Sequence, residues 1–144
     1  MSRTREQVIW DFLRQWIDKA ESDLRAAEHL LTLDQEDYFT AAFHAQQSAE
    51  KFLKAFLVRY QIPFGKTHDI NELLELVAKR AAPLQRQLAS AGMLTRFGIE
   101  FRYPGGQVAD LETAQHAVHE AHRVRTAVLE DLQDYLTRGR PTPP

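Results

Sequence analysis

Apolar residues recur at spacings of three and four along much of the chain, which is the repeat of an amphipathic helix. The first such segment runs from about Arg5 to Leu33, where charged residues of both signs fill the positions between the apolar ones. Its apolar stripe consists of Ile9, Leu13, Trp16, Ala20, Leu24, Ala27 and Leu31. We predict a long first helix with one buried stripe and one solvated, charged face.

The second segment, from about Asp37 to Arg59, is apolar on more than one face. Its second half carries bulky phenylalanine and leucine side chains, whereas its first half is slim. The slim half holds small residues at Ala41, Ala42, Ala45, Ser48 and Ala49. Small side chains let neighbouring helices approach closely, so the pattern indicates a central helix. The polar side chains that interrupt it must then find partners.

Two short helices are predicted next. A connection containing Pro63 precedes Asp69–Glu72, which has the Asp-x-x-Glu form of a capping box, although Thr67 is an alternative cap. A short helix should follow this cap. A fourth helix is predicted over about Pro83–Arg96, because proline suits the first turn of a helix. Gly92 weakens that prediction, since glycine costs about 1 kcal/mol in a helix interior.

Residues Phe97–Gly106 are rich in aromatic side chains and are predicted to form a loop. A last long amphipathic helix is predicted from Asp110 to Leu136. No strand pattern of convincing length occurs, so the fold class is all-α: an up-and-down antiparallel helical bundle with two long helix pairs and short inserted helices. Residues 1–138 would form a single domain, and residues 139–144 a disordered C-terminal tail.

Composition excludes several classes of function. The 144 residues contain no cysteine, which rules out thiolate catalysis, thiolate metal sites and disulfides. The 18 Lys and Arg nearly balance the 20 Asp and Glu, and the formal net charge of −2 provides no global basic field to attract nucleic acid. No segment reaches the roughly 18 apolar residues of a membrane span. We therefore expect a cytoplasmic protein that does not enter a membrane.

The central helix carries a row of polar residues that could bind a ligand. His44, Gln47 and Lys51 share one face of the helix, and Lys54 continues the row. Two cations and two hydrogen-bonding side chains on one face are suited to gripping a phosphate or a nucleotide. An equally weighted interpretation is that the lysines only extend their charges from a packed face while Glu50 pairs locally.

Two further clusters have the same chemistry. Lys66 and His68 lie at the start of a predicted helix, where free backbone N–H groups favour anions, although plain helix capping explains them as well. Arg102 and Tyr103 combine a guanidinium with an aromatic ring, a pairing suited to stacking a base and holding a phosphate. The alternative is that the rings plug one end of the bundle.

Three histidines of the last predicted helix, His116, His119 and His122, follow one another at intervals of three residues. A single row of this kind spreads its side chains apart, so a hydrated face is favoured over a metal site. We expect no metal and no cofactor. No Ser/His/Asp set or paired-carboxylate motif is recognisable by spacing.

Three stretches together resemble the HEPN domain. They are FHAQQSAEKFLKAFL at Phe43–Leu57, THDINELL at Thr67–Leu74 and RYP at Arg102–Pro104. The resemblance extends to the first helix and covers nearly the whole chain. It implies a helical bundle that pairs as a homodimer and is frequently encoded beside a minimal nucleotidyltransferase, as a toxin–antitoxin pair or a nucleotide-binding module.

Many HEPN domains are metal-independent endoribonucleases that use an arginine followed a few residues later by a histidine. Here no histidine follows Arg102 within reach, so the resemblance implies no catalytic residues. The expected function is a non-catalytic nucleotide-, RNA- or partner-binding module. The alternative is a metal-independent endoribonuclease toxin with an atypical centre, in which Arg102 steadies phosphate and His44 or His68 moves protons.

Overall fold

The computed structural model describes residues 2–33, 37–100, 104–105 and 108–144. Within these residues all regular structure is helical, which confirms the all-α prediction. The elements are α1 (Arg5–Leu30), α2 (Tyr38–Arg59), α3 (Ile70–Ala78), α4 (Ala82–Gln87), the 3₁₀ helix η1 (Ala89–Leu94), α5 (Thr95–Glu100) and α6 (Leu111–Arg138).

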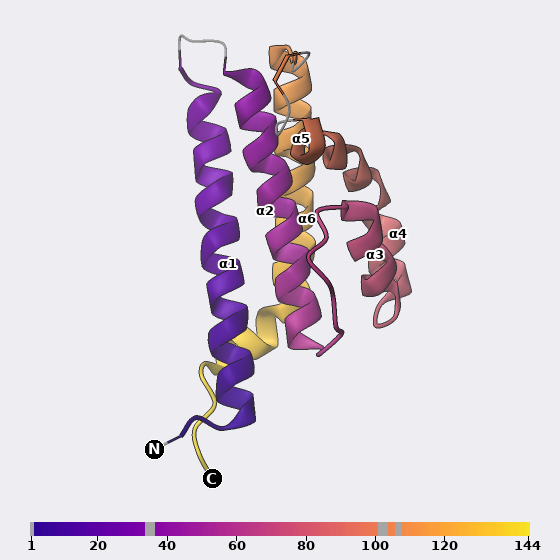
Figure 1. The fold of residues 1–144 in the computed structure, drawn as a ribbon. Coiled ribbons are helices and arrows are strands. Elements are labelled where there is room, and N and C mark those ends of the chain that lie inside the picture. The colour runs from indigo at the N-terminus through magenta and orange to yellow at the C-terminus, as the bar shows by residue number, and fades with distance from the viewer. Residues whose placement is uncertain (1, 34–36, 101–103, 106–107) are drawn as a thin grey trace.

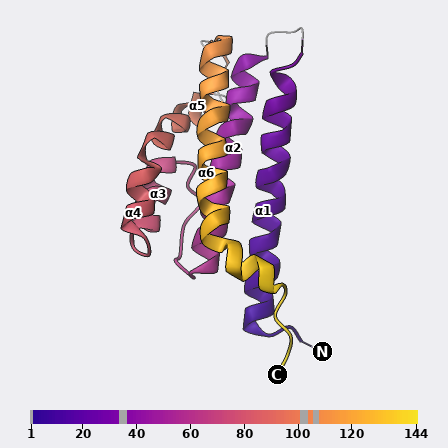
Figure 2. The same ribbon diagram turned by 180° about the vertical axis from the view of Figure 1, so that it is seen from behind.

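The long helices α1, α2 and α6 lie side by side, with α2 in contact with both of the others (Figures 1 and 2). The chain ascends in α1 and descends in α2, and the connection after α2 leads back up to the start of α3. It then descends through α3, ascends from α4 through η1 to α5, and descends in α6. The short helices pack together and cover α2 on the side away from α1. Both termini lie at the same end of the bundle.

The first half of α2 carries small side chains, which let the neighbouring helices pack closely against it. Ala41, Ala42, Ala45, Ser48 and Ala49 are all buried, as predicted. The hydroxyl of Ser48 donates to the carbonyl oxygen of Ala20 in α1 at 2.9 Å, so even the polar member of this set is satisfied. Burial of α2 on both sides makes it the central helix.

Helix starts follow the capping residues in the sequence. Asp110 accepts the backbone N–H of Thr113 at 2.8 Å and begins α6. Asp69 caps α3 by accepting the N–H of Asn71 at 2.9 Å. The predicted capping box at Asp69 is only half formed, because the carboxylate of Glu72 instead accepts the hydroxyl of Thr67 at 2.7 Å.

Two predicted boundaries were wrong. The single helix expected over Pro83–Arg96 is divided into α4, η1 and the start of α5. A Cβ at Gly92 would lie 2.0 Å from the side-chain oxygen of Asn71, so the close approach of α3 accounts for a glycine at this position. The predicted loop also begins too early, because Phe97 lies in α5, fully buried against Phe39.

Residues 139–144 contain no helix, and two of them contact α1. The guanidinium of Arg140 pairs with Asp11 at 2.9 Å. The carbonyl oxygen of Pro141 accepts a hydrogen bond from Gln7 at 3.0 Å. Among the described helices, none combines the length and the apolar character that crossing a membrane requires.

Candidate functional site: the polar face of α2

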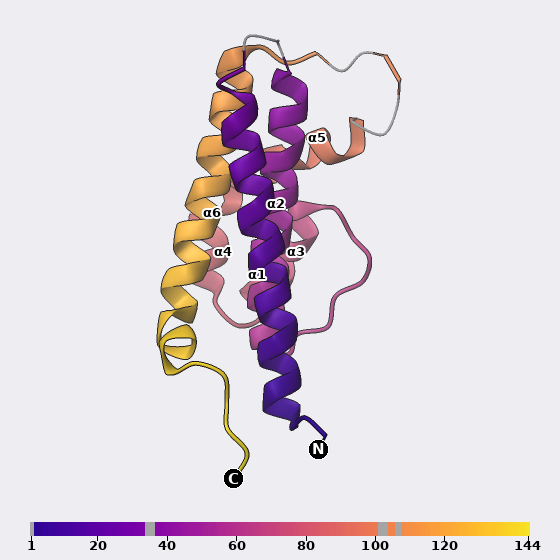
Figure 3. The same ribbon diagram turned by 90° about the vertical axis from the view of Figure 1, so that its left-hand side faces the viewer.

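The polar row predicted on α2 contacts Asp23 of α1 and His68 of the connection from α2 to α3. Figures 1 and 3 show the course of α1, α2 and this connection. We call it the α2 polar face and define it by His44, Gln47, Lys51 and His68 together with the two carboxylates that hold them, Asp23 and Glu50. Each carboxylate binds one histidine and one lysine.

Asp23 of α1 holds the first pair. Nδ1 of His44 lies 3.0 Å from Oδ1 of Asp23, and the ammonium of Lys51 donates to Oδ2 of the same carboxylate. His44 and Lys51 are seven residues apart on α2, two turns along one face, so a single acid on the adjacent helix can reach both. The Asp23 side chain is 14% exposed, whereas that of His44 is 30% exposed.

Glu50 holds the second pair from inside the bundle, where its side chain is only 3% exposed. Nδ1 of His68 lies 2.8 Å from Oε1 of Glu50. The ammonium of Lys54, one turn along α2, lies 3.3 Å from Oε2. A buried carboxylate requires such partners. The His68 side chain, in contrast, is 40% exposed.

Gln46 links the second pair to the rest of the face, although it is fully buried. Its amide nitrogen lies 3.3 Å from Glu50 and donates to the carbonyl oxygen of His68 at 3.2 Å, and its amide oxygen accepts from Gln47 at 2.7 Å. A Cβ on Gly98 would lie 2.9 Å from the Gln46 amide, so α5 approaches this network as closely as a glycine allows.

Lys54 is the one predicted lysine that lies beneath other side chains, with 6% of its side chain exposed. Its ammonium lies 5.3 Å from the centroid of the Trp16 ring and 5.7 Å from that of Phe64. Lys54 therefore follows the alternative interpretation of the sequence, in which Glu50 pairs locally. It has no route to a ligand in this conformation and instead neutralises Glu50.

The remaining predicted residues are placed as follows. Lys66 is exposed in the connection before His68 and forms no ion pair within the described part of the chain. Arg102 and Tyr103 lie outside the described residues. Asp23 and Glu50 were not among the residues predicted for the site. For Asp23 the available signal was the seven-residue spacing of His44 and Lys51, which leaves room for one shared acid on a neighbouring helix.

The charges on this face largely cancel, because each carboxylate is paired with one lysine. The face is therefore not a free cationic patch. The side chains of His44, Gln47, Lys51 and His68 are partly exposed, and the imidazoles are oriented because each Nδ1 is held by a carboxylate. Such a surface is suited to directional hydrogen bonding more than to bulk electrostatic attraction.

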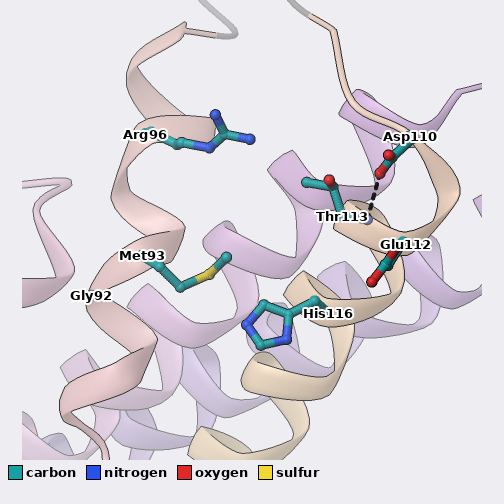
Figure 4. Close-up of a pocket in the computed structure, with 7 residues that line it drawn as sticks. All are labelled: Gly92, Met93, Arg96, Asp110, Glu112, Thr113 and His116. Carbon is teal, nitrogen blue, oxygen red and sulfur yellow. Dashed lines mark hydrogen bonds between the residues drawn. The ribbon is translucent and has the colours of Figure 1, made fainter.

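The histidines of α6 are separated from this face. The imidazole of His122 pairs with Glu28 of α1 at 2.6 Å. His116 lines a groove between η1–α5 and the start of α6 (Figure 4). Among the described residues no three or more metal-binding side chains gather at one point.

Comparison with known proteins identifies the fold. The HEPN domain model matches residues 13–132. The crystal structure of TT1696 from Thermus thermophilus is similar with a TM-score of 0.66 and 31% sequence identity, over 83% of this chain and 98% of that one. ST0689, an archaeal HEPN homologue, has a TM-score of 0.64 and 24% identity, over 83% and 97%, a likeness that concerns the fold alone. No curated protein matches the chain.

Proposed function

Because the chain belongs to the HEPN domain family, we propose that it is a non-catalytic module that binds a nucleotide or RNA on the α2 polar face. One observation carries the proposal: two partly exposed imidazoles are each fixed by a carboxylate. Asp23 of α1 holds His44 of the buried helix α2, and Glu50 of α2 holds His68 of the connection from α2 to α3. Buried polar networks of this kind are costly unless fully satisfied, and they hold side chains in defined positions.

The geometry supports directional contacts to a nucleotide. With Nδ1 held by a carboxylate, Nε2 is the ring nitrogen left for a ligand in both His44 and His68. A neutral ring accepts a hydrogen bond there from a ribose hydroxyl or a base amino group, whereas a protonated ring donates one to a phosphate oxygen. The amide of Gln47 adds a donor and an acceptor at the same face.

The lysines have unequal roles in this proposal. The ammonium of Lys51 donates one of its three N–H groups to Asp23, and the other two can donate to a phosphate. Lys54 holds Glu50 and acts on the ligand only through His68. Lys66, in the adjacent connection, is exposed and supplies a further cation. Arg102 and Tyr103 remain proposed ligand contacts.

A thermal-shift assay tests the proposal. AMP and short oligoadenylates should raise the unfolding midpoint of the wild-type protein, because a ligand that binds only the folded state stabilises it. His44→Gln and His68→Gln should remove the shift, whereas His119→Gln, an exposed histidine of α6, should retain it. The absence of any shift with wild-type protein contradicts the proposal.

The proposal includes two protein partners: a second copy of the chain, and a minimal nucleotidyltransferase. The exposed apolar side chains of Val8 and Phe12 on α1, 44% and 46% exposed, support a protein contact there. Light scattering should give the mass of a dimer for the wild-type protein and that of a monomer for Phe12→Asp. A monomeric wild-type protein contradicts the homodimer.

A second candidate function is metal-independent RNA cleavage. The contacts of His44 with Asp23 and of His68 with Glu50 favour it, since a carboxylate that orients an imidazole is a common feature of general acid–base sites. This candidate predicts cleavage of RNA without added metal and loss of cleavage in His68→Ala. Intact RNA at high protein concentration rejects it.

A further inference from the structure

A groove separate from the α2 polar face lies between η1–α5 and the first turns of α6 (Figure 4). Its volume of about 650 Å³ is within the range of small-molecule sites. Arg96 extends into it from α5, and Glu112 stands across from it on α6. Met93 and His116 line the space between these walls.

The two walls carry opposite charges that no described residue neutralises through an ion pair. The guanidinium of Arg96 is held 4.5 Å from the centroid of the Phe97 ring, which leaves its N–H groups to a ligand. Glu112 is exposed and likewise has no ion-pair partner in the part of the chain that the structure describes. A complementary ligand offers acceptors at one edge and donors at another.

The neighbouring carboxylate has a different task. Asp110 accepts the backbone N–H of Thr113 at 2.8 Å and caps α6. Hydrogen bonds from the hydroxyl and the backbone N–H of Thr113 hold the pKa of Asp110 below its ordinary value. Asp110 is therefore a fixed negative charge at the rim of the groove, and Glu112 is the carboxylate left for ligand contact.

Guanine has the polarity that these walls require. Its O6 and N7 atoms are acceptors on one edge and match the paired donors of an arginine, while its N1–H and its N2 amino group are donors that match a carboxylate. Adenine presents an amino donor beside N7 on the corresponding edge, so Arg96 would face a donor. The flexible thioether side chain of Met93 offers an adaptable apolar contact for a base plane.

We propose that this groove binds a guanine base, with Arg96 donating to O6 and N7 and Glu112 accepting from N1–H and the N2 amino group. The inference rests on the proposed function in that the ligand is a nucleotide or RNA, but it uses a different surface. A free guanosine nucleotide and an unpaired guanine in RNA offer the same base chemistry.

Isothermal titration of the full chain with GMP and with AMP tests this assignment. GMP should bind about tenfold more tightly, because a bidentate base contact gives discrimination of that order. Glu112→Gln and Arg96→Met should each remove the preference without changing the fold, as judged by the unfolding midpoint without ligand. Glu75→Gln, an exposed acid on α3, is the matched control and should keep the preference.

Parallel titrations with an oligoadenylate that contains one guanine distinguish the two sources. A preference seen only with the oligonucleotide assigns the groove to RNA, and one seen with GMP assigns it to free nucleotides. Equal affinity for GMP and AMP in both formats overturns the inference, as does a preference that survives Glu112→Gln.

The α2 polar face is tested separately. AMP binding that is lost in His68→Gln, with no guanine preference in any variant, refutes the groove and leaves the proposed function standing. A guanine preference that depends on Glu112 and persists in His44→Gln and His68→Gln, without any AMP binding, supports the groove and refutes the α2 polar face.

Discussion

His68 contacts Glu50, with Nδ1 of the imidazole 2.8 Å from Oε1 of the carboxylate. The carboxylate is buried and the imidazole is partly exposed. The contact fastens the connection between α2 and α3 to the middle of α2. The imidazole of His68, which a ligand can reach, is therefore positioned by the buried carboxylate of Glu50, which a ligand does not touch.

We predict that Glu50→Ala destabilises the protein by about 3–5 kcal/mol, because it leaves the ammonium of Lys54 buried without its counter-charge. Urea unfolding measures this loss. The double variant Glu50→Leu with Lys54→Met should recover most of the stability, since well-packed apolar residues replace a buried ion pair at little cost.

The matched control for that prediction is Asp18→Asn, which removes an exposed ion pair with Arg14 at 3.1 Å. Exposed pairs of this type contribute about 0–1 kcal/mol. A Glu50→Ala variant no less stable than Asp18→Asn would show that Lys54 reaches water in solution, contrary to the structure.

Gly98→Ala is expected to destabilise the protein by about 1–3 kcal/mol, even though alanine is the better helix former. The new Cβ would lie 2.9 Å from the amide of Gln46, whose hydrogen bonds to Glu50 and to the backbone of His68 must then shift. Gly65→Ala, where a Cβ meets nothing within 4 Å, should be neutral or slightly stabilising. The midpoints of thermal unfolding of the two variants test this prediction. Equal midpoints for Gly98→Ala and Gly65→Ala would contradict it.

The C-terminal residues should stay fixed to α1 over a wide pH range. Hydrogen bonds from Arg140 and then Arg3 lower the pKa of Asp11 from 3.8 to about 2. Because the folded-state pKa is depressed, this contribution to stability is fully present above about pH 4 and is lost as the pH falls through about 2.

Nuclear magnetic resonance relaxation of residues 139–144 measures this attachment. Their order should be unchanged from neutral pH down to about pH 4, and Asp11→Asn should loosen them at neutral pH. The Asp11→Asn variant makes the test independent of global acid unfolding. Identical relaxation in wild-type and Asp11→Asn protein would show that Arg140 does not hold the tail.

The helices with long apolar repeats could be predicted from the sequence because their stripes and caps are local signals. The cap at Asp69 and the small residues of α2 are examples. Gly92 weakened the prediction of one continuous helix, but its contact with the side chain of Asn71 from another helix could not be predicted from the sequence. The packing of Phe97 against Phe39 is also a tertiary contact. It places Phe97 in α5, although the sequence pattern predicted a loop from this residue onward.

The shared face of His44 and Lys51 was predictable from the sequence, but the pairing of these residues was not. The spacing of His44 and Lys51 placed them on one face, and the four-residue spacing of Glu50 and Lys54 made a local ion pair one of two open interpretations. That Asp23 holds both His44 and Lys51 follows only from the packing of α1 on α2.

The most direct test of the α2 polar face is to observe the ring resonances of the six histidines by nuclear magnetic resonance during titration with AMP and with a short oligoadenylate. We predict that the signals of His44 and His68 shift and saturate together, while those of His29 and His119 stay in place. No change at His44 and His68, or shifts confined to the histidines of α6, would contradict the account.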